Sequence, residues 1–442
     1  MSTPTELTPA QSAAVAYVTA AEVDAARVPE LDGISPRAIE RVVIIGGGAM
    51  GAGIAVACAE AGLETAVVER AEGVGAARER VDTTYTRHVK RQQLSEADLA
   101  ARLARVQVTS DWAAVSRASL VIEAAFEDLD VKCDIFRRLD ALAPAGAVLA
   151  TNTSYLDINV IAAATGRPAD VIGLHFFAPA NIMRLLEIVR AAASAPDAVA
   201  TGLALASKLK KQPVIAGVCD GFIGNRLFSV YRRHAEYLME DGASPEQIDA
   251  AVEALGFAMG PFAVSDLSGL DIAFAMRRRR DATRSPHERY VAIPDRLVNA
   301  GRLGRKTGAG YYCYDAAGKK SPDPVTAEII SAVRAERGIT PRTFTTEDIQ
   351  RRLLAMMANE GAKAIADGTA QRASDIDVAM VNGYGVPRTL GGPMWAADQR
   401  GLAATLADVE LAHRVGGAGS EPAPLLRDLA ANGGTLTGWR RS

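Results

Sequence analysis

Cysteine is scarce in this sequence, and the few cysteines do not form pairs. The chain of 442 residues contains four, Cys58, Cys133, Cys219 and Cys313, and none of them forms a CxxC motif. Structural zinc sites and disulfide frameworks both need cysteines at close or regular spacing, so the sequence argues against both. Scattered single cysteines fit a reducing compartment, and we expect a cytoplasmic protein without a metal site.

The sequence also lacks an excess of positive charge and any long apolar run. It has 49 Lys and Arg against 52 Asp and Glu, which gives a formal net charge of −3. We therefore expect no nucleic-acid partner, because no basic excess is available to bind phosphates. No segment approaches the ~20 apolar residues that span a bilayer, so no membrane partner is expected. The one basic run, Arg277 to Arg280, is expected to be a solvated loop.

A nucleotide-binding motif follows the first apolar run. Val42–Ile45 contains no polar residue, as expected for a parallel strand buried on both faces. Gly46, Gly48 and Gly51 then form G-x-G-x-x-G ahead of a small-residue helix. In this strand–turn–helix context the first glycine allows the tight turn, the second lets the backbone approach a pyrophosphate, and the third permits close packing. The motif predicts a dinucleotide site.

The second predicted strand, residues 65–69, indicates which dinucleotide is bound. It ends in Glu69, roughly 20 residues after the glycines, where an acid can bond the ribose hydroxyls. The charge of Glu69 would repel a 2′-phosphate, which favours NAD over NADP, although Arg70 stands next to it. Further apolar runs at 106–109, 120–124 and 147–150 continue a strand–helix alternation typical of a doubly wound sheet.

Polar residues follow the predicted strands at the edge where such sheets bind ligands. Glu127, Asn152, Ser154 and His175 each come just after an apolar run. Ser154 could instead be a turn or helix-cap residue, and Glu127 a helix-start carboxylate.

His175 and Glu187 stand in neighbouring apolar runs, so they could meet as a pair. A buried carboxylate beside an imidazole holds one tautomer and stabilises the imidazolium, which suits a general base that takes a proton from an alcohol. The alternative is a core histidine bonded to a backbone carbonyl, with the glutamate at a strand edge.

The second half of the chain is predicted to be helical and internally repeated. The pattern Ile248-Asp249 … Gly260-Pro261 … Asp266 … Gly269-Leu270 recurs as Ile376-Asp377 … Gly392-Pro393 … Asp398 … Gly401-Leu402. We therefore expect an α/β fold with a doubly wound, Rossmann-type NAD-binding domain followed by two tandem all-helical domains. The expected boundaries are 1–40 for an appended helix and linker, 41–218, 219–320 and 321–442.

Together these motifs resemble the 3-hydroxyacyl-CoA dehydrogenases, most nearly the dehydrogenase half of the bifunctional and multifunctional fatty-acid β-oxidation enzymes. The resemblance runs from about Val28 to Leu402. It is carried by Gly46-Gly-Gly-Ala-Met-Gly51, Asn152-Thr-Ser154, His175-Phe-Phe-Ala-Pro179 with Met183 and Glu187, Gly221-Phe-Ile-Gly-Asn225-Arg226, Met259-Gly-Pro261 and Lys306-Thr-Gly-Ala-Gly310.

The resemblance implies reversible, NAD-dependent oxidation of a (3S)-hydroxyacyl-CoA to a 3-oxoacyl-CoA. It makes His175 the catalytic base and Glu187 its partner, with Ser154 and Asn225 in contact with the substrate. The cofactor contacts that it implies are Gly46, Gly48, Met50, Gly51, Glu69, Glu127, Lys132, Asn152 and Lys306. Lys90 and Arg91 are candidates for the CoA phosphates, with an exposed basic helix end as the alternative.

Three departures from the family pattern bear on function. Ala178 stands where the family often has Asn, which removes any cofactor contact of that side chain, and Tyr155 replaces a second Ser and would reshape the pocket. Only residues 1–40 precede the dehydrogenase motifs, so we expect no hydratase activity.

Two helical copies could satisfy a dimer contact within one chain, which favours a monomer over a homodimer. The competing functions are a dehydrogenase of a hydroxy acid without CoA and an NAD-binding protein without turnover.

Overall fold

A run of β-branched residues forms the central strand of the sheet. The computed structural model describes residues 6–92, 95–281 and 284–441. Side chains alternate between the two faces of a strand, so Val43 and Ile45 join the core on one face and Val42 and Ile44 the core on the other. The main strands are β1 (Arg41–Ile45), β2 (Glu64–Val68), β3 (Val106–Thr109), β4 (Leu120–Glu123), β5 (Val148–Thr151), β6 (Val171–Phe176), β7 (Leu185–Arg190) and β8 (Gln212–Gly217).

These strands form one eight-stranded sheet in the order β3-β2-β1-β4-β5-β6-β7-β8. Strands β1 to β6 are parallel, β7 runs antiparallel to β6, and β8 runs parallel to β7. The order reverses between β1 and β4, and ligands of such sheets bind beyond the carboxyl ends of the strands at this point. The predicted doubly wound sheet is confirmed.

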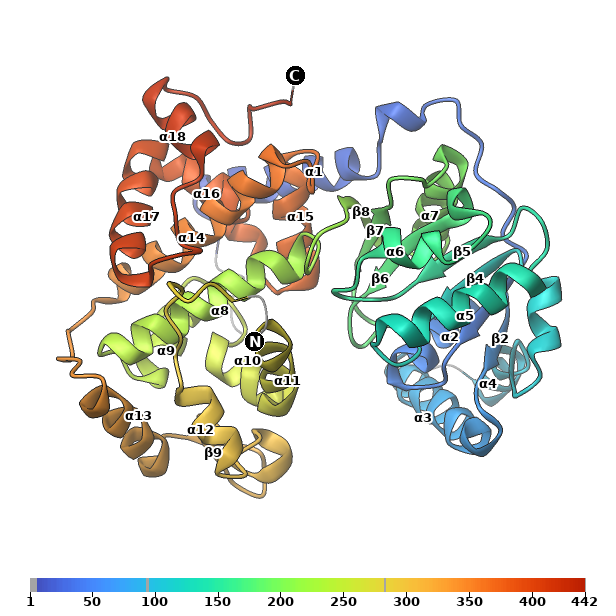
Figure 1. Ribbon diagram of the computed structural model, residues 1–442, viewed down its shortest axis with the longest axis horizontal. Coiled ribbons are helices and arrows are strands. Elements are labelled where there is room, and N and C mark those ends of the chain that lie inside the picture. Colours follow the sequence, from blue (N-terminus) through green and yellow to red (C-terminus); the bar gives the residue numbers. More distant parts are fainter. Residues whose placement is uncertain (1–5, 93–94, 282–283, 442) are drawn as a thin grey trace.

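Helices cover both faces of the sheet and form most of the second half of the chain, which was expected to be all-helical but also contains one short two-stranded ribbon (Figure 1). Residues of α2, α3 and α7 pack on one face, and residues of α5 and α6 pack on the other. The helices are α1 (Pro9–Ala25), α2 (Ala49–Glu60), α3 (Val74–Gln92), α4 (Glu96–Leu103), α5 (Leu129–Leu142), α6 (Ile158–Ala163), α7 (Pro196–Lys208), α8 (Gly224–Asp241), α9 (Pro245–Glu253), α10 (Pro261–Ser268), α11 (Leu270–Arg280), α12 (Ile293–Asn299), α13 (Pro324–Glu336), α14 (Thr346–Ala366), α15 (Ala373–Gly383), α16 (Pro393–Arg400), α17 (Leu402–Gly416) and α18 (Pro424–Ala431). Two short strands, β9 (Cys313–Tyr314) and β10 (Lys320–Ser321), form a separate ribbon.

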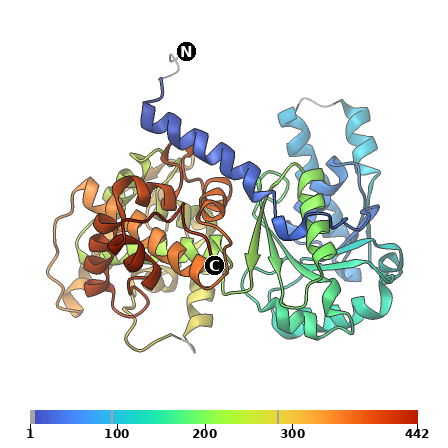
Figure 2. The same ribbon diagram turned by 90° about the horizontal axis from the view of Figure 1, so that it is seen from above.

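The N-terminal helix lies along the outside of the protein and packs one face against it. Helix α1 lies against α15 and β8, and Figure 2 shows the chain crossing from there to the sheet. Its alanines bury a face, and Tyr17 stacks on Trp395 with ring centroids 4.3 Å apart. After the crossing, Arg37 pairs with Asp170 at 2.6 Å and Asp197 at 2.9 Å. The segment expected to be a free linker therefore connects α1, which contacts the helical part, to Arg37, which is bonded to the sheet domain.

The internal repeat corresponds to a repeated hydrogen-bond arrangement. Asp249 accepts hydrogen bonds from two amides in the first turn of α10, both at 3.0 Å, and from the Tyr312 hydroxyl at 2.8 Å. Asp377 accepts from two amides in the first turn of α16, at 2.8 and 3.0 Å, and from the Tyr17 hydroxyl at 2.8 Å. In both places a buried carboxylate satisfies amides that a helix start leaves without partners. The boundaries drawn at 40, 218 and 320 stay predictions.

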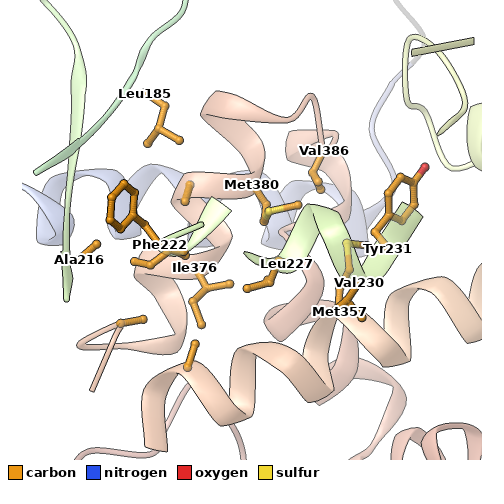
Figure 3. Close-up of a cluster of buried hydrophobic side chains, with 14 of the residues drawn as sticks. Leu185, Ala216, Phe222, Leu227, Val230, Tyr231, Met357, Ile376, Met380 and Val386 are labelled. Atoms are coloured by element: carbon orange, nitrogen blue, oxygen red, sulfur yellow. The ribbon is translucent and has the colours of Figure 1, made fainter. Parts of the chain in front are cut away.

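One apolar cluster joins the sheet to both helical units (Figure 3). Leu185 of β7 and Ala216 of β8 meet Phe222, which precedes α8. Leu227 of α8 and Ile376 of α15 continue the same cluster, and both are fully buried. Helix α14 packs against α8, α9, α16 and α17, so the helical units share one core.

We predict that Ile376→Ala lowers the free energy of unfolding by about 2–5 kcal/mol, because the cavity lies where both units meet. The matched control is Leu411→Ala, since Leu411 on α17 is 52% exposed. Urea unfolding followed by circular dichroism measures both variants. An equal loss in the two variants would contradict a shared core at Ile376.

Candidate functional site

The glycine loop after β1 has the geometry that its spacing predicted. Gly46 has φ +103°, and a Cβ there would lie 2.7 Å from the carbonyl oxygen of Ala124. A Cβ on Gly51 would lie 1.9 Å from the carbonyl oxygen of Gly46, so α2 can pack this closely on the loop only with glycine at position 51. Gly48 faces open space and directly precedes α2, whose N-terminus carries free amides. A pyrophosphate can therefore approach the backbone at Gly48, next to the N-terminus of α2.

A cavity of about 730 Å³ runs along this loop at the carboxyl ends of β1, β2 and β4. Its polar lining consists of the backbone of Gly46 and Gly48 with the side chains of Glu69 and Arg70, and Trp112 and Ile135 are among its apolar residues. Glu69 Oε2 accepts from the Gly47 amide at 2.8 Å, which fixes the carboxylate beside the loop. An apolar slot, an open amide and a fixed carboxylate fit adenosine, pyrophosphate and ribose diol. A 2′-phosphate would meet the Glu69 charge.

Two further predicted cofactor residues, Lys132 and Glu127, belong to one hydrogen-bond network at this edge. Lys132 is 1% exposed, and its Nζ lies 2.7 Å from Glu123 and 3.4 Å from Glu127. Glu127 Oε1 accepts from the Thr153 hydroxyl at 2.6 Å and from the Ser154 amide at 2.9 Å. The structure thus places Lys132 under the site, where it holds Glu127.

Asn152 joins two strand ends rather than standing free. Its Oδ1 accepts from the Phe176 amide at 2.8 Å, so the loop after β5 is tied to the end of β6. This bond leaves the amide nitrogen of Asn152 for a ligand. Met50, also predicted near the cofactor, lies in the first turn of α2 and is half-buried.

His175 and Glu187 face each other across the antiparallel pair β6–β7. His175 Nδ1 lies 2.6 Å from Glu187 Oε2, and Glu187 is fully buried. Glu187 Oε1 accepts from the amides of Ile223 and Gly224 at 3.1 and 2.9 Å. A carboxylate that already accepts two amide donors is an acceptor for the imidazole as well, so His175 carries its proton on Nδ1.

The second nitrogen of His175 is therefore a lone-pair site, and Ser154 lies beside it. Ser154 Oγ is 3.3 Å from His175 Nε2. The rings of Phe177 and Phe222 lie 4.4 and 5.6 Å from the imidazole, measured between centroids, and keep water from its flanks. The predicted triple of Ser154, His175 and Glu187 is brought together, on three different elements.

Asn225 has a partner that the sequence did not reveal. The Tyr384 hydroxyl, just after α15, donates to Asn225 Oδ1 at 2.7 Å. Burial and the Glu187 charge hold the pKa of Tyr384 well above its ordinary value, so the phenol stays a donor. Its ring lies edge-on to Phe177, with centroids 5.5 Å apart. Tyr384 is 159 residues from Asn225, and no local pattern in the sequence links them.

Lys306 does not join this group. Its Nζ lies 2.6 Å from Asp271 Oδ1, and both side chains are about half exposed. The loop that carries it is fixed by Asp266 of α10, which accepts from the amides of Tyr311 and Tyr312. The structure thus places Lys306 among the helices of the first unit rather than on the glycine loop. The side chains of Lys90 and Arg91 lie outside the described residues.

The described ranges contain neither a cluster of three or more potential metal-ligating side chains nor a helix long and apolar enough to cross a membrane.

Comparison with known proteins identifies the family. Residues 41–219 match the NAD binding domain of 3-hydroxyacyl-CoA dehydrogenase, and residues 221–314 match the C-terminal domain of the same enzyme. The solved structure of M. tuberculosis FadB2 is 39% identical and is covered completely, over 63% of this chain, with a TM-score of 0.59. The chain belongs to the 3-hydroxyacyl-CoA dehydrogenase family. The predicted cofactor, NAD, agrees with the matched domain.

Other relatives of this chain are named as bifunctional enzymes or as part of a multifunctional enzyme. The peroxisomal bifunctional enzyme of Danio rerio is 38% identical over 92% of the chain, which spans 58% of that protein. The dehydrogenase part of multifunctional enzyme 1 from C. elegans is 28% identical with a TM-score of 0.69, over 93% of this chain and 96% of that structure. The resemblance to the dehydrogenase part of such enzymes is confirmed.

We predict that Glu69→Ala raises the Kd for NADH about tenfold, because one charged hydrogen bond to the ribose contributes roughly 1.5 kcal/mol. The same variant should bind NADPH more tightly than the parent protein, since the repelling charge is gone. Fluorescence titration with both nucleotides measures this. Glu72→Ala is the matched control, because Glu72 is 70% exposed three residues away. Unchanged NADH affinity would show that Glu69 does not contact the ribose.

Proposed function

We propose that the protein catalyses the reversible oxidation of (3S)-3-hydroxyacyl-CoA to 3-oxoacyl-CoA with NAD. The observation that carries the proposal is the buried Glu187–His175 pair, whose Nε2 lies 3.3 Å from Ser154 Oγ, at the strand edge that also carries the nucleotide cavity. Family membership supplies the class of substrate. The C. elegans relative, named as the dehydrogenase part of a multifunctional enzyme, supports an activity of this segment by itself.

In this proposal His175 acts as the general base. The substrate hydroxyl lies at Nε2 and gives up its proton there, while the hydrogen on the same carbon leaves as hydride. Bound NAD supplies the hydride acceptor. Glu187 stabilises the imidazolium that forms, because its carboxylate is fixed at 2.6 Å from Nδ1. Ser154 Oγ donates to the reacting oxygen and restrains its position.

Asn225 holds the other end of the reacting group. Because Tyr384 occupies Oδ1, the amide nitrogen of Asn225 is left to donate to a carbonyl oxygen of the substrate. The second helical unit thereby contributes to a site that the first unit and the sheet would otherwise build alone.

We further propose a monomer. Helices α14 to α16 pack against α8 and α9, so the second unit covers the surface that a partner subunit could cover. The cytoplasmic location expected from the cysteines remains a prediction, because the Danio rerio and Homo sapiens relatives are named peroxisomal.

The direct test of function is the oxidation of NADH with acetoacetyl-CoA. His175→Ala should lower kcat about 10²–10⁴-fold, which is the usual contribution of a general base, while NADH still binds. Glu187→Gln should lower kcat by a smaller factor, because an amide cannot stabilise the imidazolium as well. His287→Ala is the matched control, since that imidazole is exposed. The proposal fails if the parent protein leaves NADH unoxidised or if His175→Ala keeps full turnover.

A separate prediction concerns Tyr384→Phe, which keeps the ring against Phe177 and removes the hydroxyl. We expect kcat/KM for acetoacetyl-CoA to fall about tenfold, because Asn225 loses its orienting bond, while the KM for NADH is unchanged. In an Asn225→Ala background the same change should have no further effect. Tyr231→Phe is the control, because Tyr231 is also buried in this aromatic group, 5.8 Å from Phe228 between centroids. Equal losses from both tyrosine variants would refute the orienting role.

A further inference from the structure

A second cavity, of about 430 Å³, opens beside the proposed catalytic residues on the helical side. Its wall includes Tyr155, which follows Ser154, and Arg226, which follows Asn225. Val230, Arg233 and Tyr237 also line it, at successive turns of α8. With a rise of 1.5 Å per residue, the cavity follows α8 for about 16 Å away from Asn225. It is distinct from the nucleotide cavity on the sheet.

Positive charge is concentrated in this cavity. Nine basic and four acidic residues line it, although the whole chain carries a net charge of −3. The basic run that was expected to be a solvated loop is the last turn of α11, and Arg277, Arg279 and Arg280 line the cavity. Arg277 is 13% exposed, and Glu236 and Asp295 each pair with it at 2.9 Å. Arg278 is the one arginine of the run that does not line the cavity, and its side chain is 64% exposed.

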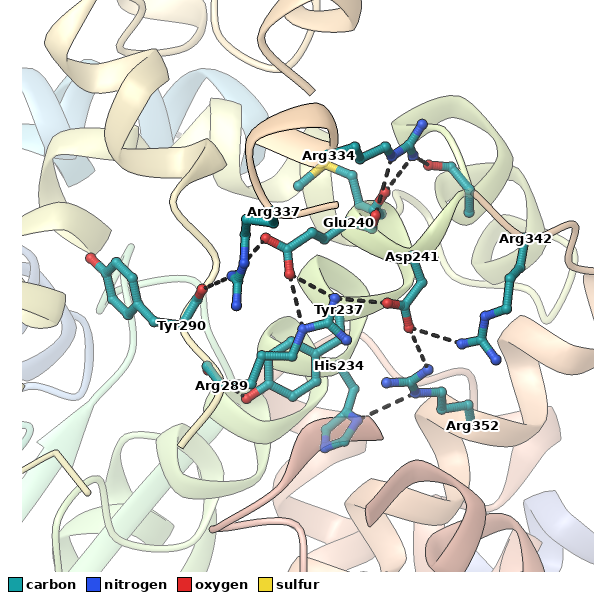
Figure 4. Close-up of polar contacts among 12 residues, drawn as sticks. His234, Tyr237, Glu240, Asp241, Arg289, Tyr290, Arg334, Arg337, Arg342 and Arg352 are labelled. Atoms are coloured by element: carbon teal, nitrogen blue, oxygen red, sulfur yellow. Dashed lines mark hydrogen bonds and ion pairs between the residues drawn. The ribbon is translucent and has the colours of Figure 1, made fainter. Parts of the chain in front are cut away.

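Arg289 of this cavity already has carboxylate partners and is structural (Figure 4). Arg289 donates to Glu240 at 2.6 Å and to Asp241 at 2.7 Å. Burial and the nearby arginines lower the pKa of His234 well below its ordinary value, so it adds no charge there. This network fixes the segment around residue 289 to α8 and leaves little capacity for a ligand.

Arg226, which follows Asn225, is paired with Glu360 at 2.7 Å and with Asp367 at 2.8 Å, whereas Arg232 and Arg279 are less completely neutralised. The contact between Arg232 and Glu236 is 3.9 Å, beyond hydrogen-bond distance, and Glu236 also pairs with Arg277. The Arg279 guanidinium lies 4.7 Å above the Tyr155 ring, and Asp220 takes one of its nitrogens at 2.9 Å. A stacked guanidinium uses its face for the ring and keeps the rest of its N–H edge for an anion. Arg233 Nε is buried and has no hydrogen-bond partner among the described residues.

We propose that this cavity binds an anionic group of the substrate, through Arg232 and Arg279, at up to about 16 Å from the reacting carbon. The inference rests on the proposed function and names the part of the substrate that the site recognises. Phosphates and carboxylates form charge-assisted, bidentate bonds with guanidinium groups, whereas the methyl end of an alkyl chain gains nothing from them. The anion has two possible sources: the phosphates of CoA, or a carboxylate at the far end of the acyl chain. Tyr155 lines the cavity between Arg279, which stacks on its ring, and Ser154, which precedes it in the chain.

The test compares kcat/KM for three thioesters in the parent protein, Arg232→Met and Arg279→Met. The thioesters are acetoacetyl-CoA, acetoacetyl-pantetheine, which lacks the phosphates, and a six-carbon 3-oxoacyl-CoA with a terminal carboxylate. Arg278→Met is the matched control, because it removes a neighbouring arginine that does not line the cavity. Methionine keeps an apolar stem of similar length and removes the charge and the N–H donors of the guanidinium.

If the cavity takes the CoA phosphates, Arg232→Met and Arg279→Met lose about tenfold or more with both CoA esters and nothing with the pantetheine ester. If it takes a terminal carboxylate, they lose that factor only with the dicarboxylic substrate. Raising the salt concentration should reduce either loss. Equal kcat/KM for Arg232→Met, Arg279→Met and Arg278→Met with every thioester would overturn the proposal.

Failure of the proposed function gives a different result. If the parent protein reduces none of the thioesters, calorimetric titration with CoA and with hexanedioate decides the matter. Weaker binding of either by Arg232→Met, but not by Arg278→Met, would support an anion site in a protein with another activity. Absence of binding by both ligands would refute the cavity as well.

Discussion

The buried carboxylate of Glu187 is the interaction on which both the fold and the site depend. It is fully buried in β7, and a buried charge is tolerated only when donors surround it. One oxygen holds His175 of β6, and the other holds the two amides at the start of α8. A single side chain thus fixes the tautomer of the histidine and the position of the first helix of the helical body relative to the sheet.

Fixing the start of α8 also places Asn225, because it is the next residue in that turn. The position is crowded: a Cβ on Gly224 would lie 2.3 Å from the Tyr384 ring, and a Cβ on Gly383 would lie 2.5 Å from Leu185. Glycine at both positions lets α15 come close enough for Tyr384 to reach Asn225. The second helical unit therefore lies against the proposed site through direct backbone approach, and its packing and its chemical contribution have one cause.

Charge is arranged to fit two different ligands on two sides of this centre. On the sheet side the Glu69 carboxylate, open amides and Arg70 line a cavity whose remaining walls are apolar. On the helical side guanidinium groups dominate, some neutralised by buried acids and some stacked on aromatic rings. Because the net charge of the chain is slightly negative, this separation comes from where the helices bring the arginines, not from overall composition.

The sequence by itself determined the doubly wound sheet and the dinucleotide loop, because these depend on local patterns such as Gly46 to Gly51, and it predicted that His175 and Glu187 meet, as they do in the structure. It also revealed the repeated aspartates that cap α10 and α16. Only the tertiary structure showed that Lys132 pairs with Glu123, that Lys306 pairs with Asp271, that α1 packs one face against the core, and that Tyr384 reaches Asn225. Each of these depends on contacts between residues far apart in the chain, whose energies are set by burial and packing rather than by spacing.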